Sequence, residues 1–586
     1  MIRGIGTSKG IGMGKALIVD SPELEVKVTQ ITDVGAEKKR YESAKQEFIT
    51  ETKQMMEELK QRLGEKDKTA LILQNQIYLI NDAEMDKGIH QLIESRKVCA
   101  EAAVEETCAL YIKIFAGSDS EAVNQRVADI IDLKNRVIGI LMGVKKVDLT
   151  HLPEGTIIVA KELQPSVTAV MDTKHVAGIV AEKGGDTSHA AILARALEIP
   201  AVLSIKNALE KIKNDDFVIV DGEYGEIFIN PIPKTIQIYE KKRNIYQEQV
   251  QELKKYINKE TVTKDGKKVC LASNIGNAQD AAKAMEAGAE CVGLFRTEFL
   301  FMNGVSMPTE EEQFEAYKKA AVICKEKVLT IRTLDIGGDK DIPYMGLVKE
   351  GNPFLGYRAI RFCLGRTDIF TVQLRAILRA SAYGNIRIMI PLVTGINELR
   401  TVKTILHNIM RELDQKEIKY DKNIPVGIMV ETPAACVMAD VLAKEADFFS
   451  IGTNDLTQYT IAVDRGNENV AYLYSAFHPA VLRSIKRVIE CAKEENIEVG
   501  MCGEAAADSA MIPVLLAFGL DEFSVTASKV LETRKNIASW TMKEAAAVTD
   551  TVMGMSTEKE VSTYLRDYIV SKTALESKEA CNGTGI

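Results

Sequence analysis

Short apolar runs alternate with segments of helical periodicity through the second half of the chain. Between residue 261 and about residue 540, eight runs have the length and apolar content of buried strands. The predicted strands are Val269–Ser273, Cys291–Leu294, Val328–Arg332, Arg387–Ile390, Val426–Val430, Phe448–Ile451, Val499–Cys502 and Glu522–Val525. Eight strand-then-helix units within about 280 residues are typical of a (β/α)₈ barrel, so we predict this fold here.

The first half of the chain begins with a different pattern. Residues from about 30 to 143 contain no proline and are rich in Glu, Lys, Gln, Ala and Leu. Apolar residues recur at helical spacing, as Leu71, Leu73, Ile77 and Ile80 illustrate. This pattern predicts a helical bundle.

Short β-rich runs stand on both sides of this bundle, among them Ala16–Val19 before it and Phe217–Asp221 after it. We therefore expect one α/β domain that starts at the N-terminus and into which the bundle is inserted. A charged segment then predicts a linking helix, and a polar tail that we expect to be disordered closes the chain. The predicted organisation is an α/β domain of residues 1–22 plus 144–232, an inserted helical domain of 23–143, a linker helix of 233–260, a barrel of 261–573 and a polar tail of 574–586.

Composition narrows the possible functions. A hydrophobic content of 46% and a charged content of 27% are ordinary for a globular protein. The net charge of −9 and the lack of a basic run argue against nucleic acid as a partner. No stretch reaches the about 18 consecutive apolar residues of a membrane helix, and the N-terminus lacks the form of a signal peptide. Ten cysteines without a CxxC pair favour reduced thiols, so we expect a cytoplasmic protein without membrane insertion.

Charged side chains stand where the predicted barrel strands end, and that end carries the active site in barrels of this kind. The planar fork of Arg suits phosphate and carboxylate, two carboxylates suit Mg²⁺, and a thiol can give a proton to carbon. The pattern therefore predicts a site for a polyanionic small molecule and a hard metal. The residues are Arg296, Arg332, Glu431, Asn454, Asp455 and Cys502 at or just after strand ends, with Arg358 and Arg465 in the connections.

Each of these residues also has an ordinary structural interpretation. A single Arg at a strand end is more often part of a surface salt bridge, and Glu431 also fits a helix cap. Asn454 with Asp455 also fits a turn, and Cys502 alone fits a small buried hydrophobe. Their joint position at one end of separate strands favours a site over these alternatives.

His189 follows a glycine turn at the start of a predicted helix. The glycines permit positive φ, and Thr187 or Ser188 can cap the helix. Free N–H groups in the first helical turn favour a bound phosphate, and an imidazole is a usable nucleophile at neutral pH. We therefore predict that His189 accepts a phosphoryl group, with Thr168 placed to fix its tautomer. The other histidines, His90, His151, His175, His407 and His478, fit ordinary structural positions.

Several long motifs resemble Enzyme I of the bacterial phosphotransferase system, and the resemblance covers the chain from near residue 1 to about residue 570. The motifs that carry this resemblance are Gly184–Arg195, Gly293–Met302, Pro308–Phe314, Asp335–Lys340, Asn352–Arg361, Asp447–Arg465 and Met501–Glu504. Motifs of this length and number make the resemblance specific.

The resemblance implies a phosphoenolpyruvate-protein phosphotransferase. It implies that the helical domain docks the carrier protein HPr, that the barrel forms a homodimer, and that transfer to HPr is the first step of sugar uptake. The phosphohistidine domain would swing between the barrel and HPr, with the helix at 239–260 absorbing the movement. The implied roles are His189 as phosphorylated nucleophile, Arg296, Arg332, Arg465, Asn454 and Asp455 as phosphoenolpyruvate ligands, Glu431 and Asp455 as Mg²⁺ ligands, and Cys502 as proton donor to the enolate.

The chain departs from the family pattern at two places. Asp186 stands three positions before His189, where the family usually has a basic or neutral residue, and its charge should repel an incoming phosphate. We therefore expect slowed phosphorylation of His189 and a faster rate in Asp186→Arg. Gln74–Gln76 replaces a stretch expected to carry more charge or a histidine, while acidic residues of 82–86 remain to meet a basic partner. A divergent HPr is the expected carrier.

Two alternative functions share parts of this pattern. A pyruvate-phosphate dikinase or phosphoenolpyruvate synthase shares the histidine turn and barrel, but it needs a large nucleotide-binding domain. The helical insert is too small for one, and no P-loop motif is present in the sequence. A regulatory phosphorelay protein that binds partners by its phosphorylation state is the other alternative, and the full set of barrel residues argues against it.

Overall fold

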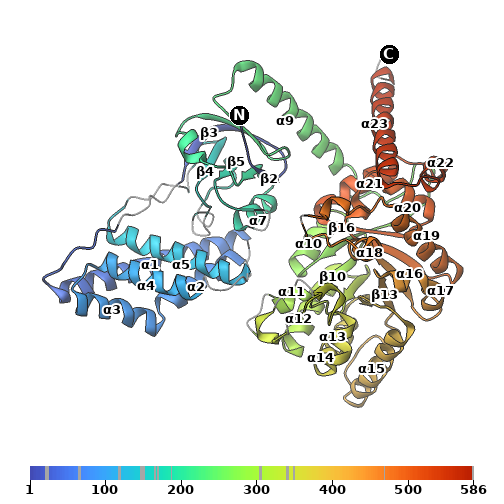
Figure 1. Cartoon of the computed structure of the whole chain (residues 1–586), viewed down its shortest axis with the longest axis horizontal. Helices are drawn as coiled ribbons and strands as arrows, with labels where there is room; N and C mark the ends of the chain where they lie inside the picture. Colours follow the sequence, from blue (N-terminus) through green and yellow to red (C-terminus); the bar gives the residue numbers. More distant parts are fainter. Residues whose placement is uncertain are drawn as a thin grey trace. The chain divides into compact units, whose positions relative to one another are not determined.

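The computed structural model divides the chain into two compact units, Met1–Gln249 and Val250–Ile586 (Figure 1). The residues that it describes are 1–19, 26–63, 68–115, 121–144, 149, 152–163, 167, 171–185, 188–302, 306–337, 342–347, 350–467 and 469–583. None of the helices in this described part has the length and apolar character needed to cross a lipid bilayer.

An eight-stranded sheet forms the frame of the first unit, in the order β1-β8-β7-β3-β4-β5-β6-β2. Apolar side chains are buried on both of its faces, with Ile158 and Ile179 on one and Ile157 and Val180 on the other. The strands are β1 (Ile2–Arg3), β2 (Ile5–Ser8), β3 (Ile11–Ile18), β4 (Thr156–Ala160), β5 (Val176–Ala181), β6 (Ala201–Leu203), β7 (Phe217–Asp221) and β8 (Glu226–Ile229). Helices α7 (His189–Ala196) and α8 (Ala208–Lys211) contribute to opposite faces.

A helical bundle lies in the sequence between β3 and β4, which are parallel neighbours in the sheet (Figure 1). Its helices are α1 (Val34–Leu63), α2 (Lys68–Ile80), α3 (Ala83–Arg96), α4 (Ala100–Phe115) and α5 (Glu121–Leu141). Tyr41, Phe48, Ile89, Val104 and Val137 are buried in a core of its own. The predicted insertion of a helical bundle into an α/β fold is thereby confirmed.

Eight parallel strands close into a barrel in the second unit. They are β9 (Cys270–Ile275), β10 (Cys291–Arg296), β11 (Leu329–Arg332), β12 (Ile386–Ile390), β13 (Val426–Val430), β14 (Phe448–Gly452), β15 (Glu498–Cys502) and β16 (Glu522–Thr526). Each strand matches one of the eight predicted runs, and no boundary differs by more than two residues. The predicted (β/α)₈ fold is confirmed.

Helices cover the outside of the barrel, and side chains fill its inside. A cluster of Leu294, Met389, Met429, Phe448 and Cys502 is buried between the strands, so the barrel is a packed core and not a pore. The helices of this unit are α10 (Ala278–Glu286), α11 (Glu298–Met302), α12 (Glu310–Cys324), α13 (Ile360–Gly365), α14 (Thr367–Ala380), α15 (Ile396–Gln415), α16 (Pro433–Val437), α17 (Ala439–Leu442), α18 (Thr453–Ile461), α19 (Pro479–Glu494), α20 (Ile512–Phe518), α21 (Val530–Ala538) and α22 (Met542–Met553).

Two helices bear on the predicted linker and tail. Helix α9 (Pro233–Lys254) occupies most of the segment predicted as a linking helix. Helix α23 (Glu558–Gly583) has a helical backbone through residue 583, so the prediction of a disordered tail at 574–586 was wrong there. The tail is polar, but its Ala, Leu, Glu and Lys residues are strong helix formers. Residues 584–586 lie outside the described part.

Candidate active site

The residues predicted from the strand ends come together at one end of the barrel. Because all eight strands are parallel, their C-terminal ends form one rim. Arg296 ends β10, Arg332 ends β11, Glu431 follows β13, Asn454 and Asp455 begin α18 after β14, and Cys502 ends β15.

Buried carboxylates hold Arg332 at this rim. Its Nη2 lies 2.7 Å from Glu298 Oε1 and 3.2 Å from Asp335 Oδ2, and all three side chains are buried. Burial alone would lower the pKa of Arg332, but the charges of Glu298 and Asp335 raise it above its ordinary value. The guanidinium is therefore fixed in charge and in orientation, as binding of a phosphate or carboxylate requires.

Arg358 extends this network toward α18. Its Nη2 donates to Asp335 Oδ1 at 3.0 Å and to Asp455 Oδ2 at 3.2 Å. Its Nη1 donates to the hydroxyl of Tyr459 at 3.3 Å. Asp335 therefore joins Arg332 to Arg358, and Arg358 joins Asp335 to Asp455.

Glu431 is buried beside carboxylates of like charge. Its Oε1 accepts a hydrogen bond from the backbone N–H of Leu392 at 2.6 Å. Burial, together with the charges of Asp455 and Asp335, raises the pKa of Glu431 to about 8. Gly452 makes room for this side chain, because a Cβ atom there would lie 2.7 Å from Glu431 Oε2.

Glu431 and Asp455 form a donor set that fits a divalent cation. Asp455 Oδ1 is buried and accepts no hydrogen bond from any residue that the structure describes, although Arg465 Nη2 lies 3.5 Å away. A cation would relieve the repulsion that raises the pKa of Glu431. Mg²⁺ takes few protein oxygens and leaves its other positions to water and phosphate, so these two residues suit it.

Cys502 supplies a neutral thiol at the same rim. Its side chain is buried, and burial raises its pKa to about 11. The hydroxyl of Ser450 lies 3.4 Å from its sulfur. The thiol stays protonated at neutral pH and therefore has a proton to give to a carbanion.

Arg296, Asn454 and Arg465 are the more accessible members of the set. Arg465 keeps 38% of its side chain exposed, and Arg296 and Asn454 are half-buried. The backbone carbonyl of Asn454 accepts a hydrogen bond from the hydroxyl of Tyr474 at 3.1 Å. These side chains are within reach of a ligand that enters from solvent.

Part of this network was not predicted from the sequence. Glu298, Asp335 and Tyr459 were not among the predicted site residues, and Arg358 was predicted to lie near the site without a role as a ligand. Asp335 lies three residues after the end of β11. Its position in a loop directly after a strand, and its place at the start of the motif Asp335–Lys340, could have marked it.

His189 is the first residue of α7 in the other unit. Gly184 has a φ of 112°, and Ser188 caps the helix by accepting a hydrogen bond from the N–H of Ala191. The predicted glycine turn and the Ser188 cap are confirmed. Buried Ala190, Ala191 and Ala194 fix α7 against the sheet.

The residues closest to His189 in the prediction lie outside the described part of the chain. They are Thr168, Asp186 and Thr187, and the His189 side chain itself is also outside it. Their roles therefore stay predictions, as does the effect of Asp186.

Comparisons with known proteins agree with this architecture. Family models match three parts of the chain: "PEP-utilising enzyme, N-terminal" at residues 3–126, "PEP-utilising enzyme, mobile domain" at 152–225 and "PEP-utilising enzyme, PEP-binding domain" at 250–542. The fold and these matches place the chain in the class of phosphoenolpyruvate-utilising enzymes.

Curated relatives define the family within this class. The phosphoenolpyruvate-protein phosphotransferase of Priestia megaterium is 44% identical over 96% of this chain and 98% of its own length. Its namesake in Bacillus subtilis (strain 168) is 45% identical over 97% of this chain and 99% of its own length. The chain belongs to the phosphoenolpyruvate-protein phosphotransferase family. A solution structure of an Enzyme I (nEIt) protein aligns with 42% of this chain and 100% of its own length at 33% identity, with a TM-score of 0.38.

Proposed function

We propose that this protein transfers the phosphoryl group of phosphoenolpyruvate to His189 and from there to a carrier protein of the HPr kind. The observation that carries the proposal is the buried network of Arg332, Arg358, Asp335 and Glu431 at the barrel rim. It presents fixed positive charge and carboxylate oxygens at one place, which suits a small polyanion bound with a metal ion. Membership of the family adds phosphoenolpyruvate as the anion.

The rim residues are proposed to bind and orient this substrate. Arg332 is held rigidly by Glu298 and Asp335, whereas Arg465 is exposed and free to adjust to the ligand. The proposed ligands of phosphoenolpyruvate are Arg296, Arg332, Arg465, Asn454 and Asp455. Glu431 and Asp455 would hold Mg²⁺, which when bound neutralises phosphate charge and stabilises the departing enolate.

Two groups of the chain take part in bond changes. A ring nitrogen of His189 attacks phosphorus, and the bond from phosphorus to the enol oxygen breaks with both electrons leaving on the enolate. Cys502 then gives its proton to the enolate carbon, which forms pyruvate and a thiolate that solvent reprotonates. Because its pKa is raised to about 11, the Cys502 thiol is protonated at neutral pH before each turnover.

The second transfer requires a carrier. We propose that the helical domain of residues 23–143 binds HPr and that the α/β domain of 1–22 plus 144–232 carries phosphohistidine between the barrel and HPr. We further propose a homodimer through the barrel of residues 261–573 and a cytoplasmic location. Light scattering of the purified chain, with the barrel expressed alone as comparison, tests the dimer.

Labelled phosphoenolpyruvate tests the main proposal. Incubation with Mg²⁺ should place acid-labile, base-stable label on the wild-type chain, and His189→Ala should abolish it. His175→Ala is the matched control, because His175 lies in the same unit and its ring already bonds Asp172. Added HPr should take up the label from wild type.

Three results would contradict this assignment. They are label retained in His189→Ala, label lost in His175→Ala with the fold intact, and label delivered by ATP in place of phosphoenolpyruvate. The last result would instead support a dikinase-like reaction.

A further inference from the structure

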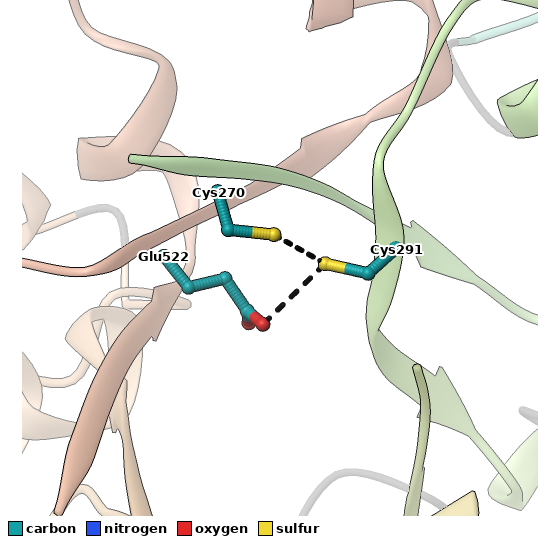
Figure 2. A group of neighbouring side chains, drawn as sticks. All are labelled: Cys270, Cys291 and Glu522. Atoms are coloured by element: carbon teal, nitrogen blue, oxygen red, sulfur yellow. Dashed lines mark hydrogen bonds between the residues drawn. The ribbon is translucent and has the colours of Figure 1, made fainter. Parts of the chain in front are cut away.

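Two cysteines and a glutamate meet at the end of the barrel where the strands begin (Figure 2). Cys270 begins β9, Cys291 begins β10 and Glu522 begins β16. Arg296 at the other end of β10 is five residues along the strand from Cys291, which at about 3.3 Å per residue is about 17 Å. The cluster is therefore separate from the proposed active site.

The two sulfur atoms face each other across neighbouring strands. They lie 2.6 Å apart, and both cysteines are free thiols. In the strand register Cys291 pairs with Ala272, and Cys270 lies two residues before Ala272 and so on the same face. Figure 2 shows the Cys270 side chain directed at the Cys291 sulfur. Because a disulfide bond is about 2.0 Å long, a small movement would join them.

Glu522 and Arg387 surround the buried member of the pair. The Cys291 thiol donates to Glu522 Oε2 at 3.6 Å, and Arg387 Nη2 lies 2.6 Å from the same oxygen. The hydrogen bond with Cys270, and then burial, raise the pKa of Cys291. Its thiol is thus neutral at rest, and the Glu522 carboxylate is placed to receive its proton.

The two thiols differ in access to solvent. Cys291 is buried, whereas Cys270 is partly exposed and lines a surface depression of about 620 Å³. Lys268, Lys493 and Asp521 line the same depression. A small reagent can therefore reach Cys270 but not Cys291. Cys270 is thus placed to react first with a disulfide reagent, and Cys291 to react second with Cys270.

We propose that Cys270 and Cys291 form an oxidisable pair that closes to a disulfide by exchange with a low-molecular-weight disulfide, RSSR. The Cys270 thiol loses its proton to solvent, and the resulting thiolate attacks one sulfur of RSSR, whose S–S bond breaks to release RS⁻. Cys291 then gives its proton to Glu522 and attacks the Cys270 sulfur, which breaks the mixed S–S bond and releases the second RS⁻. Glu522 returns its proton to solvent and the two RS⁻ groups take up two protons, so RSSR is reduced to two RSH as the protein thiols are oxidised.

A metal ion is the competing occupant of this cluster, and Arg387 weighs against it. Its guanidinium brings a positive charge next to Glu522, the carboxylate of the cluster.

The disulfide would fasten the first two strands of the barrel to each other. It closes a ring that contains α10, and it lies beside β16, with which β9 completes the barrel. Cross-linking restricts the unfolded chain more than the folded one. Oxidation should therefore raise the unfolding temperature of the barrel, and a reductant should reverse the rise.

Peptide mapping of the full-length chain tests the proposal. The protein is treated with oxidised glutathione, remaining thiols are alkylated, and the chain is cut by trypsin without reductant. Trypsin releases residues 269–283 and 284–296 as separate peptides with one cysteine each. We expect them as one cross-linked species that dithiothreitol separates, with two fewer alkylated thiols per chain. Cys270→Ser should lose the species, and Cys324→Ser, which removes another buried thiol, should keep it.

Two results would overturn the proposal. The first is recovery of both peptides unlinked from wild type, with Cys270 glutathionylated and Cys291 alkylated. The second is a rise in the unfolding temperature of the reduced chain on adding one equivalent of Zn²⁺ that is absent in Cys270→Ser. That result would assign the cluster to a metal.

Discussion

Asp335 bonds two buried guanidiniums at once, so a single carboxylate sets the spacing of Arg332 and Arg358 at the rim. Breaking a buried ion pair by removing one partner leaves an uncompensated charge. We predict that Asp335→Asn lowers the rate of phosphorylation by phosphoenolpyruvate about 10²-fold, because misplaced ligands lose their alignment with the substrate. Rapid-quench labelling measures this rate.

A fold control belongs with this variant. Thermal unfolding of Asp335→Asn distinguishes a misplaced arginine from a destabilised barrel. Glu445→Gln is the matched control, because it removes the same charge from an exposed ion pair with Arg400 and should leave the labelling rate unchanged. A wild-type labelling rate in Asp335→Asn would show that Arg332 needs no such anchor.

Cys502 offers a second test at the level of one residue. In Cys502→Ser we predict that exchange of the pyruvate methyl protons with solvent falls by about 10²–10⁴-fold, the usual contribution of a positioned acid or base. Labelling of His189 should fall much less, because breakage of the P–O bond precedes proton delivery. Proton NMR of pyruvate in D₂O measures the exchange, and unchanged exchange would exclude Cys502 as the donor.

The sequence identified those rim residues that stand directly at strand ends. Arg296, Arg332 and Cys502 could be found because strand prediction alone locates them. Glu298 and Asp335 stand in motifs that carry the family resemblance, but their role could not be predicted, because it lies in ion pairs that only the closed barrel forms. The positions of individual loop side chains depend on packing, which periodicity does not encode.

Among the helices, Arg40 connects three members of the bundle. From α1 it bonds Glu37 on the same helix, Glu101 on α4 and the carbonyl of Leu141 at the end of α5. The hydrogen bond from Arg40 lowers the pKa of Glu37 below its ordinary value of 4.5. At Glu101, burial alone would raise the pKa. The hydrogen bond and the charge of Arg40 outweigh burial, so the pKa of Glu101 is lowered too.

This connection gives the bundle an acid-sensitive element. Since both pKa values are lowered in the folded state, the stability that they contribute is present above about pH 4.5 and is lost as pH falls through the lowered values. We predict that Arg40→Met costs about 1 kcal/mol at pH 7, the scale of a partly exposed pair, and that this difference shrinks toward pH 3. Calorimetric unfolding at several pH values measures it.

The control for the Arg40 prediction is Arg96→Met, which removes an exposed pair with Glu106. It should change stability by less than about 0.5 kcal/mol. A pH-independent loss in Arg40→Met would mean that the arginine acts through packing of its stem and not through its charge.

Elements were predicted with unequal success. The barrel strands are short, apolar and bounded by polar turns, so sequence alone located them to within two residues. The end of α23 could not be located this way, because polarity indicates exposure and says little about helicity. Helix propensity would have been the better guide there.

At the scale of the whole molecule, the residues proposed for the chemistry are divided between the two units. His189 lies in Met1–Gln249, while Arg332, Glu431 and Cys502 lie in Val250–Ile586. The first unit has apolar cores of its own. We predict that a fragment of residues 1–254 takes label from phosphorylated HPr but not from phosphoenolpyruvate, whereas the full chain takes it from both. Label from phosphoenolpyruvate on the fragment would refute this division.

The bundle spans two strands that lie side by side and run the same way, with Ile18 opposite Val159. Any connection between such strands must cross over the sheet, and here five helices serve as that crossing. Because β3 and β4 pair with each other directly, another connecting segment could replace the bundle without changing the order of the strands in the sheet. Since we propose that the bundle binds the carrier protein, one exchange of this segment would change the carrier that the chain serves and leave the residues of the barrel rim unchanged.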